Sequence, residues 1–359
     1  MTSVLKKVLS VRQVRLVGLD VGSSSVKMVQ LERDEQGYYA TAATMIDIDT
    51  QTEDDQQLRD NTVSAISKCM DTADVRTRNA VCGLCGPDVM VGGFSFPQLP
   101  PEATEQAVLL EARQVCPLDI SSSVVDYQII NSQDDVSTEQ NQTGTKGIFV
   151  VATNDAVDGK KQRVADASVK NVLMDVDGLA LLNCLGEYER CRTGHSIAIL
   201  DVGSSFTNVI ILGNDGLPFI RDLPYAANAI INQIAQDNNI PAQTVAKVLR
   251  GTEDSSELHL EVNAGLKSAC RKLVNDITET LRYYTLQETT SPIDKIFLCG
   301  GFALVEGFAD MLDESLPEKV VILNPFTKIR CKADDVGNKL LRDCGPAMAV
   351  AAGLAMRSV

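Results

Sequence analysis

The chain has 359 residues, a formal net charge of −15, 44% hydrophobic residues and 23% charged residues. This length favours two or more subdomains over a single core, and the composition is typical of a globular protein. The acidic charge, the absence of tryptophan and the aromatic content of 4% argue against nucleic acid as a partner and against base-stacking surfaces. No apolar run approaches the roughly 20 residues that a membrane-spanning helix needs.

Residues 1–15 form a basic lead-in to this acidic protein, with Lys6, Lys7, Arg12 and Arg15. The apolar residues between them are spaced so that a short amphipathic helix could lie weakly on a membrane surface. A flexible lead-in is the simpler interpretation. Because a charged pair interrupts the apolar run that a signal peptide requires, we do not expect secretion.

Residues 16–31 (LVGLDVGSSSVKMVQL) predict a β-hairpin with a turn the size of a phosphate group. Gly22 permits the positive φ of a tight turn and lets backbone N–H groups approach a ligand, and the serines after it add hydroxyl donors. Lys27 supplies a cation, and Asp20 can hold Mg²⁺ through its water shell. By itself, an Asp-x-Gly turn between two strands is more often only a hairpin turn.

The chain next predicts a strand at 38–48, a helix at 58–69 and a strand at 79–84, which is consistent with an α/β layer. The last strand leads into a Cys82-x-x-Cys85 pair. Zinc would need a second such pair or nearby histidines, and the chain has only two histidines, both isolated in the sequence. We favour buried small residues in a reducing compartment over a metal site.

Residues 89–167 look like an inserted module with the order strand, helix, strand, strand and helix. We expect its elements at 89–99, 102–115, 124–130 and 148–152, with a polar loop at 131–147 and a last helix capped by Asn154 or Asp155.

The first hairpin is repeated later in the chain. The pentapeptide Asp-Val-Gly-Ser-Ser, which begins at Asp20, recurs unchanged from Asp201 within residues 197–212 (IAILDVGSSFTNVIIL). Two copies indicate two similar half-domains. If their turns face each other across a cleft, the phosphates of one nucleotide can be held from both sides.

The remaining elements follow the chain from residue 171. We expect a return to the first half-domain at 171–185, a strand and helix at 216–231, a helix at 240–251 that starts at Pro241, one long helix at 262–286, a strand, Gly-Gly turn and amphipathic helix at 296–312, a strand at 320–323, and a final small-residue helix at 345–356.

Two such hairpins and a later Gly-Gly turn at 299–302 resemble the superfamily of actin, sugar kinases and heat-shock ATPases. Within it, the chain most resembles the PilM family of type IV pilus assembly proteins, which are relatives of the division protein FtsA. The resemblance covers nearly the whole chain. Among the stretches that carry it are GLDVGSSSVKMVQL (18–31), LLEARQVCPLDISSSVVDYQII (109–130), LDVGSSFTNV (200–209), LCGGFALVEGFADML (298–312) and GPAMAVAAGLAMR (345–357).

The resemblance implies an α/β protein with the actin-like two-lobed ATPase fold, two ribonuclease-H-like half-domains and an inserted 1C-type subdomain of strand-helix-strand-strand order. The implied parts are a lead-in at 1–15, subdomain 1A at 16–87 and 169–194, subdomain 1C at 88–168, subdomains 2A and 2B at 195–339, and a C-terminal helix at 340–359 that returns to 1A.

The same resemblance implies an ATP site with Mg²⁺ between the lobes. Asp20 and Asp201 would hold Mg²⁺ through water, and Lys27 would contact the β-phosphate. Gly300 and Gly301 would lie against the adenosine. The other nucleotide-binding residues implied by the resemblance are Gly22, Ser23, Ser24, Gly203, Ser204, Ser205, Thr207 and Asp276.

Asp177 stands where the superfamily often places the residue that orients attacking water. A carboxylate there can act as a base. The alternative is an aspartate that starts a helix and satisfies its backbone N–H groups.

Three residues depart from the family pattern. Ala226 and Ala227 stand where the family usually has two glycines, and alanine cannot adopt glycine's backbone angles. Glu279 stands where relatives have an arginine, three residues after Asp276, and it adds negative charge beside a polyanion. We therefore expect weakened ATP binding with at most slow hydrolysis, and a cleft retained only as structure is the alternative.

In function, the resemblance implies a cytoplasmic scaffold of the type IV pilus platform, held at the inner membrane through its partners. It would bind the cytoplasmic N-terminal peptide of a PilN-like single-span membrane protein in a groove involving residues 89–130. Pilus motor and platform proteins are further implied partners, and self-association stays open. The alternatives are an FtsA-like division protein, a type II secretion platform component and a small-molecule kinase.

Overall fold

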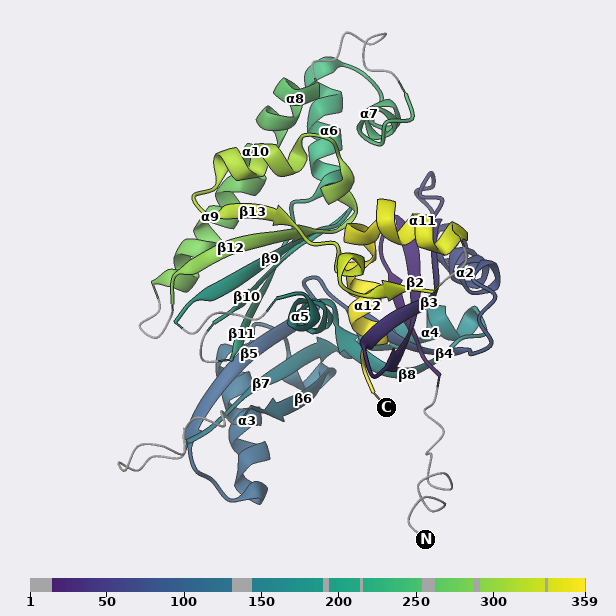
Figure 1. Cartoon of the computed structure of the whole chain (residues 1–359). Helices are drawn as coiled ribbons and strands as arrows, with labels where there is room; N and C mark the ends of the chain where they lie inside the picture. The colour runs from purple at the N-terminus through teal and green to yellow at the C-terminus, as the bar shows by residue number, and fades with distance from the viewer. Residues whose placement is uncertain are drawn as a thin grey trace.

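The computed structural model describes residues 15–130, 144–189, 194–213, 216–253, 262–286, 291–332 and 335–358. They form a mixed α/β structure with three sheets (Figure 1). The first 14 residues of the basic lead-in and most of the polar loop expected at 131–147 lie outside the described residues. No helix in the described ranges is long and apolar enough to cross a membrane.

Two of the sheets have the same topology. In the first lobe the order is β14 (Arg330–Cys331), β3 (Gly37–Asp47), β2 (Ser25–Asp34), β1 (Val17–Val21), β4 (Asn79–Leu84) and β8 (Lys170–Val176). In the second lobe it is β11 (Pro218–Leu223), β10 (Thr207–Leu212), β9 (Ser196–Val202), β12 (Ile293–Cys299) and β13 (Lys319–Ile322). The central strand of each sheet, β1 or β9, pairs antiparallel with the strand that follows it and parallel with a later one. The repeated pentapeptide therefore marks a repeated half-domain.

Apart from Ser196, Asp20 and Asp201, the central strands are apolar, because helices cover both faces of each sheet. All five residues of β1 are buried. On one face, Leu19 packs with Ile66 of α2 (Asp55–Thr72) and Val164 of α4 (Asn154–Asp166). A continuous apolar run, rather than an alternating one, is the pattern that such doubly covered strands need.

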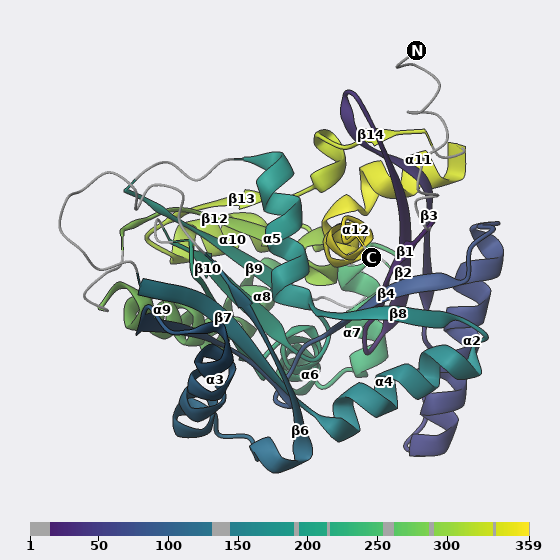
Figure 2. The same ribbon diagram turned by 90° about the horizontal axis from the view of Figure 1, so that it is seen from below.

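Two helices, α5 (Asp177–Tyr188) and α12 (Ala349–Ala355), lie between the two sheets (Figure 2). They share one apolar cluster with strands of both lobes, including Val81 of β4 and Phe297 of β12. The packing is tight enough to exclude side chains: a Cβ at Gly18 would lie 2.0 Å from the Ala351 carbonyl oxygen. The small-residue helix expected over 345–356 is instead a 3₁₀ turn at Gly345–Met348 followed by α12, and its small residues allow it to pack into the first half-domain.

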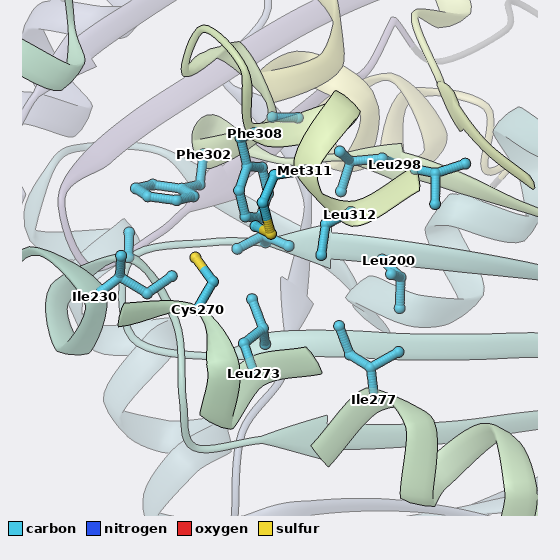
Figure 3. Close-up of a cluster of buried hydrophobic side chains, with 14 of the residues drawn as sticks. Leu200, Ile230, Cys270, Leu273, Ile277, Leu298, Phe302, Phe308, Met311 and Leu312 are labelled. Atoms are coloured by element: carbon cyan, nitrogen blue, oxygen red, sulfur yellow. The ribbon is translucent and has the colours of Figure 1, made fainter. Parts of the chain in front are cut away.

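The second lobe has its own core (Figure 3). The sheet is covered by α6 (Ala227–Asn238), α7 (Ala242–Leu249), α8 (Val262–Ala269), α9 (Arg271–Thr285) and α10 (Phe308–Ser315). Phe302 and Phe308 pack edge to face, with ring centroids 4.7 Å apart, beside Met311. The helix before α12, α11 (Asp335–Asp343), places Leu341 in a separate cluster of the first lobe.

The inserted module is a three-stranded antiparallel sheet with the order β5 (Val89–Pro97), β7 (Gly144–Thr153) and β6 (Ser123–Ile129). One face is covered by α3 (Pro101–Val115), whose Val108 packs with Phe149 of β7. The central strand β7 continues directly into α4.

Other expectations about element boundaries are also wrong. The helix expected over 262–286 is two helices, because the ψ of Cys270 (−4°) between α8 and α9 is far from the roughly −42° of an α-helix, although its φ (−80°) is in the helical region. The cap of α4 is Thr153, whose side chain accepts a hydrogen bond from the amide of Ala156, and not Asn154 or Asp155. The strand after the polar loop begins at Gly144, earlier than expected.

Candidate functional site

The turns of the two repeated hairpins touch each other. We call residues 22–24 the first turn and residues 203–205 the second turn. The hydroxyl oxygens of Ser24 and Ser204 are 2.5 Å apart, and Ser205 donates to the hydroxyl of Ser23 at 2.8 Å. The structure thus brings these four predicted phosphate-binding residues together from segments half a chain apart.

Each turn is closed by one backbone hydrogen bond of the same kind. The amide of Gly22 donates to the Ser25 carbonyl, and the amide of Gly203 donates to the Phe206 carbonyl, both at 3.1 Å. Gly22 does not have the positive φ that we expected of it. Its small size matters instead, since a Cβ there would lie 3.2 Å from the Ser25 carbonyl oxygen.

Behind the first turn, Asp20 and Lys27 form a buried ion pair with 3.0 Å between Oδ2 and Nζ. The two residues are direct cross-strand partners on β1 and β2, so the hairpin register itself makes the pair. Burial lowers the pKa of Lys27, but the Asp20 carboxylate outweighs it and the pKa is raised. Lys27 is therefore firmly positive beside the turn.

Two further carboxyl groups lie in the field of this pair. Burial raises the pKa of Asp201 to about 7, the Asp20 carboxylate adds to the shift, and Lys27 opposes it. Burial also raises the pKa of Asp177 to about 7, again with Asp20 as the next cause. Carboxylates gathered with too little positive charge favour a bound cation.

Mg²⁺ held through its water shell fits this donor set. Within the described ranges, no three His, Cys, Asp or Glu side chains are arranged to hold a metal ion. Mg²⁺ usually keeps several waters and takes only one or two carboxylates. Asp20 and Asp201 supply two carboxylates that lie in each other's electrostatic field, which is the number that Mg²⁺ would take.

Asp177 has an unusual environment for a residue that starts a helix. Its Oδ1 atom is buried and has no hydrogen-bond partner, and it lies where a Cβ at position 83 would be 1.7 Å away. Gly83 on β4 therefore makes room for this carboxyl group. Its other neighbour is the Cys85 thiol, which hydrogen-bonds to it. Oδ1 of Asp177 therefore caps no backbone N–H group of α5, and its pKa of about 7 means that the carboxyl group changes protonation near neutral pH.

The two cysteines of the Cys-x-x-Cys pair differ in their exposure to solvent. Cys82 is buried, as expected, but Cys85 is exposed. Although water reaches Cys85, the surrounding protein and Asp177 raise the pKa of its thiol well above the ordinary value. The thiol is therefore protonated at neutral pH.

Sequence analysis missed two polar residues at this interface. Asp222 on β11 accepts a hydrogen bond of 2.5 Å from the amide of Gly86, and burial raises its pKa to about 6. Lys160 on α4 donates to the carbonyl oxygen of Val21 at 2.8 Å. Both contacts join segments far apart in the chain, and only the charge of Asp222 within a largely apolar strand could have drawn attention to it.

The second turn is held by the start of α6. The amide of Ala227 donates to the Gly203 carbonyl at 3.1 Å, and the next amide donates to the Ser204 carbonyl at 2.9 Å. The alanine at the expected glycine pair causes no strain, because Ala226 has an extended backbone (φ −155°) that any residue adopts. Thr207 is fully buried and its hydroxyl donates to the Tyr225 carbonyl, so the structure does not present it to a ligand beside the turn.

The glycine pair after β12 has two different environments. Gly300 has φ +92°, and a Cβ there would lie 2.5 Å from Asp201 Oδ1, whereas a Cβ at Gly301 would meet nothing within 4 Å. Gly300 thus lets the chain pass close to Asp201, and Gly301 faces open space.

The structure does not join the α9 residues to the turns. Asp276 is bound by Lys272, with 2.8 Å between the charged atoms, and Glu279 is exposed on the same helix. Among the contacts of the described residues, neither reaches the first or second turn.

The chain is similar to known proteins over most of its length. A family model described as type IV pilus assembly protein PilM matches residues 18–359. A solved structure described as a PilM-PilN type IV pilus biogenesis complex is similar at 22% identity, with 96% of this chain and 98% of that chain covered and a TM-score of 0.80.

Two more distant structures share the fold. The ethanolamine utilization protein EutJ from Carboxydothermus hydrogenoformans has 13% identity, 95% and 88% coverage and a TM-score of 0.54. A diol dehydratase-reactivating factor in nucleotide-free form has 11% identity, 94% and 98% coverage and a TM-score of 0.51. With the repeated sheet topology, these similarities establish the actin-like two-lobed fold.

Proposed function

Because the chain belongs to the PilM family of type IV pilus assembly proteins, we propose that it is a nucleotide-binding scaffold of the pilus inner-membrane platform. The observation that carries this proposal is the family match, which runs from residue 18 to residue 359 and so includes both lobes and the inserted module. The scaffold is cytoplasmic and is held at the inner membrane by its partners.

The nucleotide is ATP with Mg²⁺, bound between the two turns. Asp20 and Asp201 orient the water shell of Mg²⁺, Lys27 contacts the β-phosphate, and the backbone amides and hydroxyls of both turns contact the other phosphate oxygens. Bound Mg²⁺ supplies positive charge to the phosphates. Because the serines of the two turns hydrogen-bond to each other, ATP binding has to separate the turns, and those hydroxyls then turn from each other to the phosphates.

Hydrolysis, if it occurs, is slow and uses Asp177. The raised pKa of this carboxyl group and its unpartnered oxygen suit it to hold the proton of an attacking water. The surroundings support binding more than turnover, since Asp177 is buried against Gly83 and its second neighbour is a protonated thiol.

The membrane partner is a PilN-like single-span protein, whose cytoplasmic N-terminal peptide binds beside the inserted module of residues 88–168. Support comes from the similar structure that is described as a PilM-PilN complex. The module also has a suitable edge: β6 is the last strand of its sheet, and Val124 on it is 48% exposed. An extended peptide can add to such an edge through main-chain hydrogen bonds.

Calorimetry with the full-length protein tests this function. The probe is a synthetic peptide of the first residues of the host's PilN-like protein, and a scrambled peptide of the same composition is the control. We expect saturable binding of the native peptide alone, and recovery of the same membrane protein by a tagged bait from detergent-solubilised membranes. Absence of both would overturn the scaffold proposal, and recovery of a tubulin-like protein instead would indicate the FtsA-like alternative.

A further inference from the structure

Lys160 joins the inserted module to the first turn. Its Nζ atom donates a hydrogen bond of 2.8 Å to the carbonyl oxygen of Val21. Val21 is the last residue of β1 and directly precedes Gly22. The contact therefore fixes the point at which the strand ends and the first turn begins.

Lys160 also brings positive charge to the site from a different part of the protein than Lys27 does. Lys27 belongs to the hairpin that carries the first turn, whereas Lys160 belongs to α4. Burial raises the pKa of Asp177, and the charge of Lys160 opposes that shift. The same charge opposes the raised pKa of Cys85. A movement of Lys160 would therefore change both the support of the turn and the field around it.

The helix that carries Lys160 is continuous with the inserted sheet. Thr153 is both the last residue of β7 and the N-cap of α4, so no loop separates the two elements. β7 is also the central strand, paired along most of its length with β5 and β6. Lys160 lies seven residues beyond Thr153, roughly 10 Å along the helix axis. The other end of α4 is anchored, since Val164 is fully buried in the first-lobe core. Val157, between Thr153 and Lys160, is buried with Ala152 of β7 and Leu84 of β4, so a displacement of β7 is passed through this packing to α4 and to Lys160.

We propose that Lys160 is a positioning residue that couples the three-stranded sheet to the first turn. The inference rests on the proposed function, in which the sheet belongs to the peptide-binding module and the turn belongs to the nucleotide site. While the bond to Val21 is made, the end of β1 and the start of the first turn are held in place. When the peptide moves the sheet, the bond lengthens and the positive charge withdraws. Because coupling between two sites is reciprocal, peptide and nucleotide then change each other's affinity by one factor.

The test measures this factor in wild type and in four variants. The factor is the ratio of the peptide Kd without and with Mg²⁺-ATP, measured by calorimetry on the full-length protein. For wild type we expect a factor in the usual range of about 5 to 150. Lys160→Met should bring it to below about 2, while both ligands still bind. Lys160→Gln, which keeps a hydrogen-bond donor without the charge, separates the two contributions.

The controls use the same helix. Lys160→Arg keeps the charge and a donor, and we expect it to retain most of the factor. Lys161→Met changes the next lysine, which is exposed, and should leave the factor unchanged. If Lys160 only stabilised the fold, Lys160→Met would lower the thermal unfolding temperature, and the coupling factor would not be retained selectively in Lys160→Arg.

The outcomes separate this inference from the function on which it rests. If wild type fails to bind the peptide or the nucleotide, the proposed function is wrong. If wild type binds both without coupling, or if Lys160→Met couples as wild type does, the proposal for Lys160 is wrong. Should Lys160→Met not fold, hydrogen exchange on the unaltered protein decides: the peptide must change amide exchange at residues 21–25, and unchanged exchange there overturns the proposal.

Discussion

The two turns share one pentapeptide but are held in place by different interactions. In the first lobe, Asp20 lies opposite Lys27 in the strand register, and in the second lobe its counterpart Asp201 lies opposite Asn208. The first turn is also supported by a lysine from α4. The second turn is supported by backbone amides at the start of α6.

The two copies therefore share some features and differ in others. The backbone and its closing hydrogen bonds are the same in both copies, but the charge is not. The first copy neutralises its own carboxylate, whereas burial and neighbouring carboxylates raise the pKa of Asp201 to about 7. The second copy therefore has no cross-strand cation to balance its carboxylate.

The largest expected effect comes from breaking the first pair. Asp20→Asn leaves Lys27 buried without its partner, and we expect the free energy of unfolding to fall by about 3 kcal/mol. Urea unfolding of the nucleotide-free protein at pH 8 measures this. The double variant Asp20→Asn with Lys27→Met should recover most of the loss. A single variant as stable as wild type would show that the two turns do not differ in this way.

Nucleotide binding should need both carboxylates despite their different surroundings. Asp20→Ala and Asp201→Ala should each weaken Mg²⁺-dependent ATP binding by roughly tenfold or more, as expected for loss of about 1.5 to 3 kcal/mol from a charged contact. Fluorescence anisotropy with a labelled ATP analogue measures the affinity, and EDTA should abolish the difference between the variants and wild type. Unchanged affinity in both variants would remove these residues from the site.

The aspartate-to-asparagine substitution beside the second turn should raise the free energy of unfolding, whereas the one beside the first turn lowers it. Asp201→Asn removes a carboxylate that the folded state holds at a cost, so we expect a gain of about 1 kcal/mol at pH 8 without Mg²⁺. The matched comparison is Asp20→Asn under identical conditions. A loss of stability in both variants would contradict the proposed charge difference.

The pH dependence sharpens this comparison. The pKa of Asp201 is about 7 in the folded protein against an ordinary value of 3.8, so the folded state binds this proton more tightly than the unfolded state does. The contribution to stability is therefore greatest below pH 4 and is lost as the pH rises to 7. Between pH 5 and pH 8, the stability of wild type should fall relative to that of Asp201→Asn. Parallel curves for the two proteins would show that Asp201 does not titrate in this range.

The smallest expected effect concerns the contact between the turns. Ser24→Ala and Ser204→Ala each remove one partner of the hydroxyl pair, at a cost of about 0.5 to 1 kcal/mol. A double-mutant cycle by thermal unfolding should give a coupling energy of similar size. Additive effects would mean that the turns do not hold each other together in solution.

Local sequence patterns predicted the strands and turns whose conformation depends mainly on neighbouring residues. The strand at 79–84 was predicted with its bounds, because an apolar run there ends at a glycine and a proline. The repeated pentapeptide predicted two similar half-domains, but not that their turns touch each other. The break at Cys270 could not be seen, because Leu266 and Leu273 both lie in the core and continue one apolar stripe across it.

The polar contacts of the site were harder to predict than its turns. Lys160 and Asp222 act on backbone atoms far away in the chain, and nothing near them in the sequence indicates those partners. The unexpected φ of Gly22 has a related cause: the turn uses the small size of glycine where the motif suggested its left-handed conformation.

The position of α12 has a consequence for how the protein is made. This helix covers one face of the first-lobe sheet, where Ala351 packs with Val29 of β2, and it also packs closely against α5 at Gly353. The ribosome synthesises β2 early and α12 late. Until α12 emerges, the apolar face that it covers is open to water and to other chains. The first lobe can therefore complete its core only after the second lobe has been synthesised, although its own strands come first.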